Sequence, residues 1–455
     1  MNETLVESPK IDNQLPPVAP PEEAAALVSP PQQTIEKKDE RSYGSIALWC
    51  LKWIWIALIG TLFCQMALFA LFVVGWAQRY MQRCVVRRWF RIKQGKFTPR
   101  EWEVFVNQDA ELAYLNKAPN WFWRQKGIAW PQSEPGFKGF IKLLGPRIAF
   151  PLHSFGKNLK LGFQAIINIW IFTLPACVLW LYAWHAGWNN SFNKIYEQAY
   201  VGPLTGILGF LLFIAAMFYV PMAHTRQAAT GQWRSFFEFD LVWRIVRDRW
   251  LSVIGLAALF SLVSLPLSIM KMAPVFMMQS GSNLATMSDM ELLGFLRGYY
   301  LFVGLLGFIA YVSLRVVSAR IYAKGVLRCV EKGRLSIEQL APVERRVMGR
   351  LGVIALDAQE PRHVIVRAGA WTGRRFFGVT GFAVLVIIWF SFVAQIFISE
   401  FFNYHPFRAW MNQPLVQLPW YQSIPQHLLD AEKEHKAAQA MLNTDAEISA
   451  EGEFE

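Results

Sequence analysis

The sequence contains few charged residues for its length. Charged side chains account for 17% of the 455 residues, whereas soluble domains usually contain about 25%. Hydrophobic residues account for 54%, with 20 Trp and 35 Phe, and aromatic rings favour the interface between lipid and water. The net charge is +12, and the basic residues that produce it flank the apolar runs. This pattern is typical of attraction to anionic lipid and argues against a nucleic-acid partner.

Cysteine is also scarce, and no cofactor site is visible. The five cysteines form no CxxC pair, which excludes a disulfide framework and a zinc site: Cys50, Cys64, Cys84, Cys177 and Cys329. We interpret them as small apolar residues. The histidines occur singly, so His185 and His224 are expected to form hydrogen bonds rather than to bind haem or metal. We therefore predict no cofactor and no metal ion.

The sequence lacks the short motifs of common enzymes. It contains no GxxxxGK[ST] loop, no GxSxG elbow and no HExxH helix. A catalytic pair of carboxylates near a span end on the inner side could only be Glu238 and Asp240. Each of them, however, has a basic residue four positions away. That spacing predicts ion pairs on a helix surface, namely Arg234–Glu238, Asp240–Arg244 and Arg244–Asp248. We therefore predict no catalytic residues and a non-enzymatic protein.

Long apolar runs, by contrast, dominate the sequence. Because a helix needs roughly 20 apolar residues to cross the hydrocarbon core, we count six spans, at about 47–76, 163–184, 203–223, 251–270, 298–318 and 376–398. The first run is about 30 residues long and is either one strongly tilted helix or a hairpin that folds back near Gly60. Two halves of the run would each be too short to cross, which favours the single helix.

The distribution of Lys and Arg predicts which loops face the cytoplasm. Residues 78–161 contain 16 of them, residues 224–250 contain five and residues 315–375 contain 13. The loop at 185–202 has one, the loop at 271–297 has two, and residues 399–455 have three against nine acidic residues. The basic loops are therefore predicted inside and the C-terminus outside. A single first span would place the N-terminus outside, whereas a hairpin would place it inside.

These patterns predict an all-α fold: a polytopic membrane helix bundle of about six spans with amphipathic interfacial helices on the cytoplasmic side. The predicted segments are a disordered acidic, Pro-rich tail (1–45), the first span (46–77), a basic interfacial loop (78–161), a four-span core (162–318), a cytoplasmic appendage (319–375), the last span (376–398) and an external acidic tail (399–455). Capping boxes predict helices from Thr98 to about Asn116 and from Ser336 towards Arg350. The fifth span should continue to about Lys332, a strand could form at 363–367, and a helix is expected from Gln426 to Met441 with disorder from Asn443.

The central stretch 221–250 combines aromatic and basic residues between two spans. A helix over 234–250 would have two apolar faces, one with Phe236, Phe239, Val242, Trp243, Val246 and Trp250 and one with Phe237, Leu241 and Ile245. An interfacial helix needs only one apolar face, so we hypothesise that this helix is buried on both sides and organises the inner surface. The candidate contacts for a partner or lipid are Trp121, Trp123, Arg124, Lys126, Arg234, Phe236, Phe239, Trp243, Arg244, Arg247 and Trp250.

Three short motifs resemble a group of uncharacterised bacterial six-span membrane proteins, which are related to the membrane domain of some glycerophosphodiester phosphodiesterases. They are Gly75-Trp76 with Arg79, the segment 155–163 (FGKNLKLGF) before Leu174-Pro175, and the segment 228–231 (AATG) before 236–240 (FFEFD). The resemblance covers about residues 46–320 and implies a bacterial membrane bundle. It confers no activity, because no phosphodiesterase domain is present.

The function that fits these features is a scaffold or accessory subunit of a complex in the bacterial inner (cytoplasmic) membrane. Its expected partners are anionic lipids and other membrane or cytoplasmic proteins. One alternative is a transporter or flippase-like protein for a lipid or apolar compound, with a groove lined by Asn168, Thr173 and Gln395. A lipid-headgroup enzyme is the other alternative, and phosphate bound near Arg234, Arg244 or Arg247 would favour it.

Overall fold

The computed structural model describes residues 43–109, 111–121, 137–182, 201–279, 283–353, 418–420, 422 and 424–452, with a few isolated positions between 369 and 380. The chain divides into two compact units, Met1–Leu51 and Lys52–Glu455, and the contacts described below lie within the second. Within the described ranges the regular elements are helices, without a strand. The predicted all-α fold is thus confirmed for this part of the chain; the possible strand at 363–367 lies outside it.

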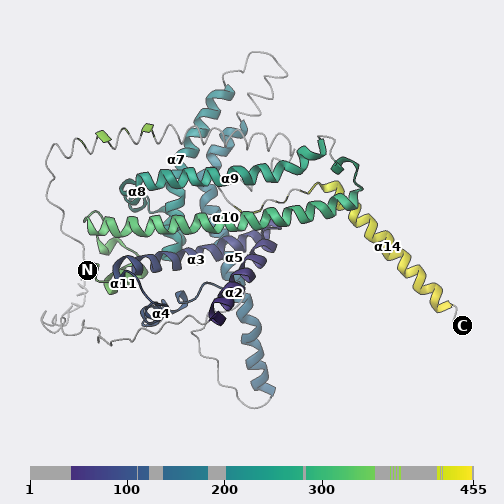
Figure 1. The fold of residues 1–455 in the computed structure, drawn as a ribbon, viewed down its shortest axis with the longest axis horizontal. Coiled ribbons are helices and arrows are strands. Elements are labelled where there is room, and N and C mark those ends of the chain that lie inside the picture. Colours follow the sequence, from purple (N-terminus) through teal and green to yellow (C-terminus); the bar gives the residue numbers. More distant parts are fainter. Residues whose placement is uncertain are drawn as a thin grey trace, which may run out of the picture. The chain divides into compact units, whose positions relative to one another are not determined.

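The elements alternate between long apolar helices and short connecting helices, some of them 3-10 helices (η). They are α2 (Tyr43–Phe63), α3 (Ala67–Gln94), α4 (Pro99–Asn107), η1 (Ala113–Leu115), α5 (Phe137–Tyr182), α7 (Val201–Thr230), η3 (Trp233–Phe237), α8 (Phe239–Asp248), α9 (Trp250–Gln279), η4 (Asn283–Thr286), α10 (Asp289–Glu331), η5 (Ile337–Gln339), α11 (Pro342–Arg350) and α14 (Gln426–Gly452). Helix α5 packs on α3 and α7, and α10 lies beside α9 and α3 (Figure 1). One large apolar core joins these helices with α8 and α11.

Two described helical segments are long and apolar enough to cross a membrane, Ser154–Ala176 and Asp289–Glu331. They overlap the second and fifth predicted spans. Shorter apolar helices occur at Ala47–Phe63 and Trp250–Phe260. Almost all of the predicted last span, 376–398, lies outside the described residues.

The first apolar run is not one continuous helix. Helix α2 ends at Phe63 and α3 begins at Ala67. The ring of Trp53 meets that of Tyr80 edge to face, with centroids 5.7 Å apart, so the chain folds back on itself. The favoured single helix was therefore wrong and the hairpin alternative matches the structure, although the turn lies at 64–66 instead of near Gly60. Gly60 has a different role, because a Cβ there would lie 2.3 Å from the ring of Phe308 on α10.

Two glycines allow α3 and α5 to cross in backbone contact. A Cβ at Gly75 would lie 1.8 Å from the carbonyl oxygen of Asn158, and one at Gly162 would lie 1.9 Å from that of Leu71. Any larger residue would force the helices apart, since real Cβ atoms do not approach so closely. These glycines therefore set the distance between α3 and α5, and with it the position of every polar side chain that the two helices share.

Local capping signals were correct in some places and misplaced in others. The box formed by Thr98 and Glu101 starts α4 as predicted, but the helix ends at Asn107 instead of near Asn116. Helix α10 ends at Glu331 with Lys332 as its cap, as predicted. Ser336 provides no side-chain cap. The helix begins at Pro342 instead, where Glu344 accepts a hydrogen bond from the backbone N of Ala341.

Helix α14 packs on the N-terminal part of α10. Leu428 is fully buried against Leu292, Leu293 and Leu296, and Arg297 pairs with Glu432 at 2.6 Å. The helix starts at Gln426 as predicted but continues to Gly452. The expectation of disorder from Asn443 is therefore wrong for residues 443–452, among which the pairs Ala446-Glu447 and Ala450-Glu451 favour a helix.

Candidate functional site

The C-terminal end of α7 gathers the largest set of buried polar groups in the described chain. All ten residues from 221 to 230 are buried, because this end of the helix is enclosed by α3, α8, α10, α11 and η3, while α5 packs along the same helix. Five of the buried residues are polar: His224, Thr225, Arg226, Gln227 and Thr230. A buried polar group is tolerated only with hydrogen-bond partners, so the neighbouring helices must supply them.

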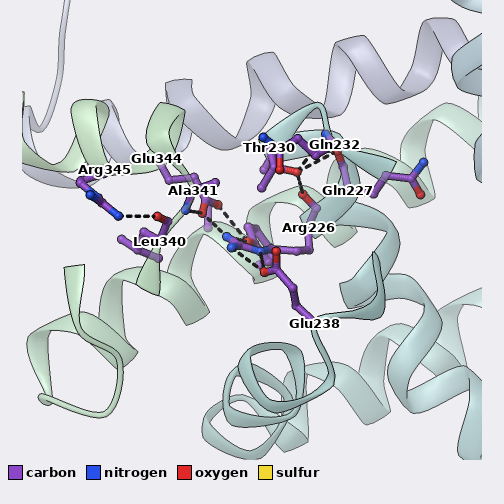
Figure 2. A network of polar contacts seen from close by, with 12 residues as sticks. Arg226, Gln227, Thr230, Gln232, Glu238, Leu340, Ala341, Glu344 and Arg345 are labelled. Carbon is purple, nitrogen blue, oxygen red and sulfur yellow. Dashed lines mark hydrogen bonds and ion pairs between the residues drawn. The ribbon is translucent and has the colours of Figure 1, made fainter. Parts of the chain in front are cut away.

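Arg226 is at the centre of this set (Figure 2). Its Nε and Nη2 donate to one carboxylate oxygen of Glu238 at 2.8 and 2.7 Å. Its Nη1 donates to the hydroxyl of Tyr322 at 3.2 Å and to the carboxylate of Glu344. The hydroxyl of Tyr322 in turn donates to Glu344 at 2.9 Å. One guanidinium on α7 is thus connected to three other parts of the fold: Glu238 at the start of α8, Tyr322 on α10 and Glu344 on α11.

The electrostatics of this network favour the charged form of Arg226. Burial alone would lower the pKa of Arg226, but Tyr322, Glu344 and Glu238 together outweigh burial, and the net pKa is raised. Arg226 is 1% exposed and Glu344 is 0% exposed. An ion pair so deeply buried is a poor source of net stability, but the loss of one partner leaves an uncompensated charge. The network therefore holds α11 in one position relative to α7.

A second buried pair connects α3, α7 and α10 through His224. Arg315 Nη1 lies 2.7 Å from His224 Nδ1. Because a guanidinium can only donate, Nδ1 accepts. The other ring nitrogen, Nε2, contacts the side-chain amide nitrogen of Gln78. Burial, and after it the charge of Arg315, lowers the pKa of His224 well below its usual range. His224 is therefore neutral, and it forms hydrogen bonds as the sequence led us to expect.

Asn168 and Thr173, two residues of the proposed transport groove, are buried within the helix packing. Asn168 Nδ2 donates to the side chain of Gln227 at 3.0 Å and to the carbonyl of Trp233 at 3.3 Å. The hydroxyl of Thr173 donates to the carbonyl of Ile169 in its own helix at 3.0 Å. Both side chains are fully buried, so neither lines an open groove. Gln395 lies outside the described residues.

The structure brings together residues from the short motifs in 75–79 and 155–163. Arg79 of α3 donates to Asn158 of α5 at 2.9 Å, and Asn158 donates to the carbonyl of Trp121 at 3.2 Å. The backbone crossing at Gly75 lies directly beside this bond. In the third motif, Gly231 adopts φ +71, a conformation that favours glycine, and it ends α7 so that η3 can turn back.

The central stretch is not one helix over 234–250. It forms η3 and α8, because the backbone of Glu238 leaves the helical region at φ −75 and ψ 68, where its carboxylate reaches Arg226. A second irregular residue, Arg249, separates α8 from α9. Of the three predicted ion pairs, Arg244–Asp240 is confirmed at 2.5 Å. Asp248 instead pairs with Lys332 and Arg334 of the segment that follows α10.

Helix α8 has one buried face, which takes residues from both predicted apolar faces. Val242 and Val246 of the first face and Leu241 and Ile245 of the second are all buried. The remaining apolar residues of the helix point outward, with Phe239 52% and Trp243 54% exposed. One side of the helix thus packs in the protein and the opposite apolar side is left uncovered by the described residues, so burial of that second side against lipid or a partner stays a prediction.

The candidate contact residues divide into three groups. Phe236 is fully buried, and Trp121 is 3% exposed because its indole stacks on Trp76 with centroids 4.9 Å apart; both expectations of surface contact are therefore wrong. Phe239, Trp243, Arg234 and Arg247 are exposed, and Arg244 and Trp250 are partly exposed. Trp123, Arg124 and Lys126 lie outside the described residues.

Sequence reasoning missed Arg226, Tyr322 and Glu344 as a unit. Arg226 was counted with the other basic residues of its loop, and Glu344 lies 118 positions further along the chain. No local spacing connects the two. Among the described residues, no group of three or more His, Cys, Asp or Glu side chains could hold a metal ion. The carboxylates of the network instead bind a cation that the chain itself provides.

Comparisons of this chain with protein-family models, with curated proteins and with solved structures find no match.

Proposed function

We propose that this protein is a non-enzymatic, multi-span scaffold or accessory subunit of a complex in the bacterial cytoplasmic membrane. The observation that carries the proposal is a contrast between paired charges and unpaired aromatic rings at one end of the bundle. The buried Arg226 pairs with the buried Glu344 and the partly exposed Glu238, and these charges join helices to one another. The neighbouring surface of η3 and α8 presents exposed aromatic rings, which an isolated soluble surface has no reason to expose.

This surface, which we call the aromatic–basic surface, comprises Trp233, Arg234, Phe239, Trp243 and Arg247. Trp233 is 44% exposed, and Phe239 and Trp243 are more than half exposed. Aromatic and arginine side chains are enriched at the centres of protein interfaces. Tryptophan also favours the headgroup region of a membrane. Both properties suit a docking platform that lies at the membrane surface.

The membrane arrangement that we propose has six apolar segments and basic loops on the inner side. Helices α7 and α9 have 30 residues each, or about 45 Å at 1.5 Å per residue, which exceeds the roughly 30 Å of a hydrocarbon core. The hairpin of α2 and α3 would enter and leave on the inner side, which also suits the basic residues before α2. A relation to the bacterial six-span proteins named above is part of this proposal, supported by the meeting of Gly75, Arg79 and Asn158.

The test compares the wild type with two variants, each of which introduces one glutamate at an exposed apolar position. Trp243→Glu alters the aromatic–basic surface, and Met441→Glu alters α14, where Met441 is 69% exposed. Each protein is purified from native membranes in mild detergent, and its mass and protein composition are compared. We expect the wild type and Met441→Glu to form a complex larger than the 52.2 kDa chain, and Trp243→Glu to lose the partner.

Membrane accumulation of each variant is measured in parallel, so that loss of the partner can be separated from loss of the protein. A wild-type protein that purifies as a single chain without partners would overturn the scaffold function. If Trp243→Glu formed the same complex as the wild type, the aromatic–basic surface would not be the docking site of the partner.

A further inference from the structure

Four cations meet on α10, where α3 and the end of α8 each pack against it. Trp89 of α3 donates its indole N–H to the carbonyl of Ala323 on α10 at 2.8 Å. This bond places Arg88 and Lys324, the neighbours of the two bonded residues in the sequence, at the same level of the bundle. Both bonded residues are fully buried, so the position of the two helices is well fixed at this point.

Arg249 joins them from the junction of α8 and α9. A Cβ at Gly325 would lie 2.6 Å from Ile245 and 3.3 Å from Cγ of Arg249. The side chain of Arg249 therefore lies directly against α10, beside Lys324 and about one turn before Arg328. We call Arg88, Arg249, Lys324 and Arg328 the cation cluster. Lys324 is close enough to interact electrostatically with each of the other three.

The cation cluster has no ion-pair partner among the described residues, although acidic groups lie nearby. Asp248 is engaged by Lys332 at 2.7 Å and by Arg334 at 3.0 Å. Glu331 is engaged by Lys93 at 2.9 Å. The adjacent carboxylates thus form their ion pairs with other cations. Asp248 offsets the charge of Arg249 only in part, and the cluster retains a net positive charge.

Two hydrogen-bond donors in the cluster are buried without an acceptor. The Nε atoms of Arg88 and Arg249 are both shielded from solvent and make no hydrogen bond in the described chain. Burial and the charge of Arg328 lower the pKa of Arg249. An unsatisfied charged donor is costly, and the oxygen atoms of a phosphate group would relieve both that cost and the mutual repulsion.

The position of the cluster along α10 indicates where such a phosphate would come from. Phe302 and Ile309 are 52% and 49% exposed, and Lys324 and Arg328 continue the exposed side of the same helix. Lys324 lies six residues beyond the end of the predicted span at 318, or about 9 Å at 1.5 Å per residue. The headgroup region extends about 5–8 Å beyond the hydrocarbon core, so Lys324 would start at its outer edge, from where a long cationic side chain can reach a headgroup phosphate. The exposed apolar residues would meet acyl chains and the cations would meet the headgroup.

We propose that Arg88, Arg249, Lys324 and Arg328 form a binding site for the phosphate of an anionic membrane lipid of the inner leaflet. The site deepens the proposed function, on whose membrane arrangement it rests, because it specifies which lipid chemistry the inner surface recognises and at which residues. A bound lipid would bridge α3, α8 and α10 and would stabilise the helices that carry the aromatic–basic surface.

The experiment measures lipid binding by the purified full-length protein in detergent, with phosphatidylglycerol as the anionic probe and phosphatidylcholine as the zwitterionic control. The test variant is the double substitution Lys324→Gln and Arg328→Gln, since both side chains are exposed and should tolerate the change. The matched control is Lys96→Gln with Arg100→Gln, which removes the same charge at exposed positions on α4 and its preceding loop. Native mass spectrometry and a lipid titration provide the two readouts.

We expect the wild type and the control variant to bind phosphatidylglycerol at least tenfold more tightly than phosphatidylcholine, and the test variant to lose at least tenfold in affinity for phosphatidylglycerol. Equal affinities for the two lipids, or equal losses in the two variants, would overturn the site. An added series with inorganic phosphate distinguishes the source of the ligand. Saturation of the site by free phosphate at lower concentrations than the lipid requires would overturn the lipid assignment.

The outcome is independent of the scaffold test, because the lipid titration uses purified protein without a partner. Lipid binding as expected, without a co-purifying protein, would support the lipid site and refute the scaffold function. A stable complex with no preference for phosphatidylglycerol would support the scaffold function and refute the lipid site.

Discussion

Arg226 and Glu344 exemplify a charge pair that is completely withdrawn from solvent. Neither side chain is more than 1% exposed, so neither can recover hydration if the other is removed. Glu238 also contacts Arg226, but its side chain is 39% exposed, and water can replace it in part. The two carboxylates therefore differ in how much the fold depends on them, although both bind the same guanidinium.

We predict that Glu344→Gln lowers the free energy of unfolding by about 3–5 kcal/mol, because it leaves the buried Arg226 charge without its closest partner. Glu238→Gln should lower it by no more than about 1 kcal/mol, as for a solvent-accessible ion pair. Unfolding by denaturant in detergent micelles, followed by tryptophan fluorescence, measures both. The double variant Arg226→Met with Glu344→Leu should recover most of the loss. Similar effects of the two single variants would contradict the role assigned to Glu344.

At the scale of the element, the crossing of α3 and α5 depends on the absence of side chains at two positions. We predict that Gly75→Ala and Gly162→Ala each lower the free energy of unfolding by about 1–3 kcal/mol, the usual effect of overpacking. The reason is that each new Cβ would lie within 2 Å of a carbonyl oxygen. Thermal unfolding in detergent, with membrane yield, is the measurement.

Gly156→Ala and Gly255→Ala are the matched controls, because a Cβ at either position meets nothing within 4 Å. Each control replaces a glycine inside a helix by alanine and should be neutral or slightly stabilising. Equal behaviour of the four variants would show that the helices do not cross as described.

The attachment of α14 to α10 should depend on pH. Hydrogen bonds from Arg297 and Lys436 lower the pKa of Glu432 to about 2 from its usual 4.5. A carboxylate with a depressed pKa contributes its full stabilisation above its unfolded pKa and loses it as the pH falls towards the folded pKa. We predict that protection of the first turns of α14 from hydrogen exchange decreases from about pH 4.5 downwards. In Glu432→Gln the decrease should be absent and protection should be low throughout; an unchanged pH profile would refute the role of the pair.

At the scale of the whole molecule, the proposed membrane arrangement is tested by the side of the membrane on which each surface lies. We predict that an impermeant thiol reagent added to intact cells without an outer membrane barrier labels Asn443→Cys and does not label Arg234→Cys. Both positions are exposed in the structure, so accessibility of the side chain does not limit the reaction. The assay requires a background in which the natural exposed Cys50 is replaced. Labelling of Arg234→Cys alone would invert the proposed topology.

The sequence by itself determined the features that depend on residues a few positions apart. Helical class followed from the long apolar runs and their periodicity, and the start of α4 followed from Thr98 and Glu101. The end of α10 near Lys332 and the ion pair Asp240–Arg244 were equally local. Such features are predictable because their stabilising contacts lie within one or two helical turns.

Only the tertiary structure decided which apolar and polar residues face inward. Val220 is 2% exposed and Leu204 in the same helix is 67% exposed, yet both are apolar. In the membrane arrangement proposed above this is expected, because lipid accepts the same residue types that fill a core. The hairpin turn at 64–66, the burial of Trp121 and the pairing of Arg226 with Glu344 across 118 positions have the same origin. Each depends on which helices meet, and that choice is made by distant contacts which no local pattern in the chain records.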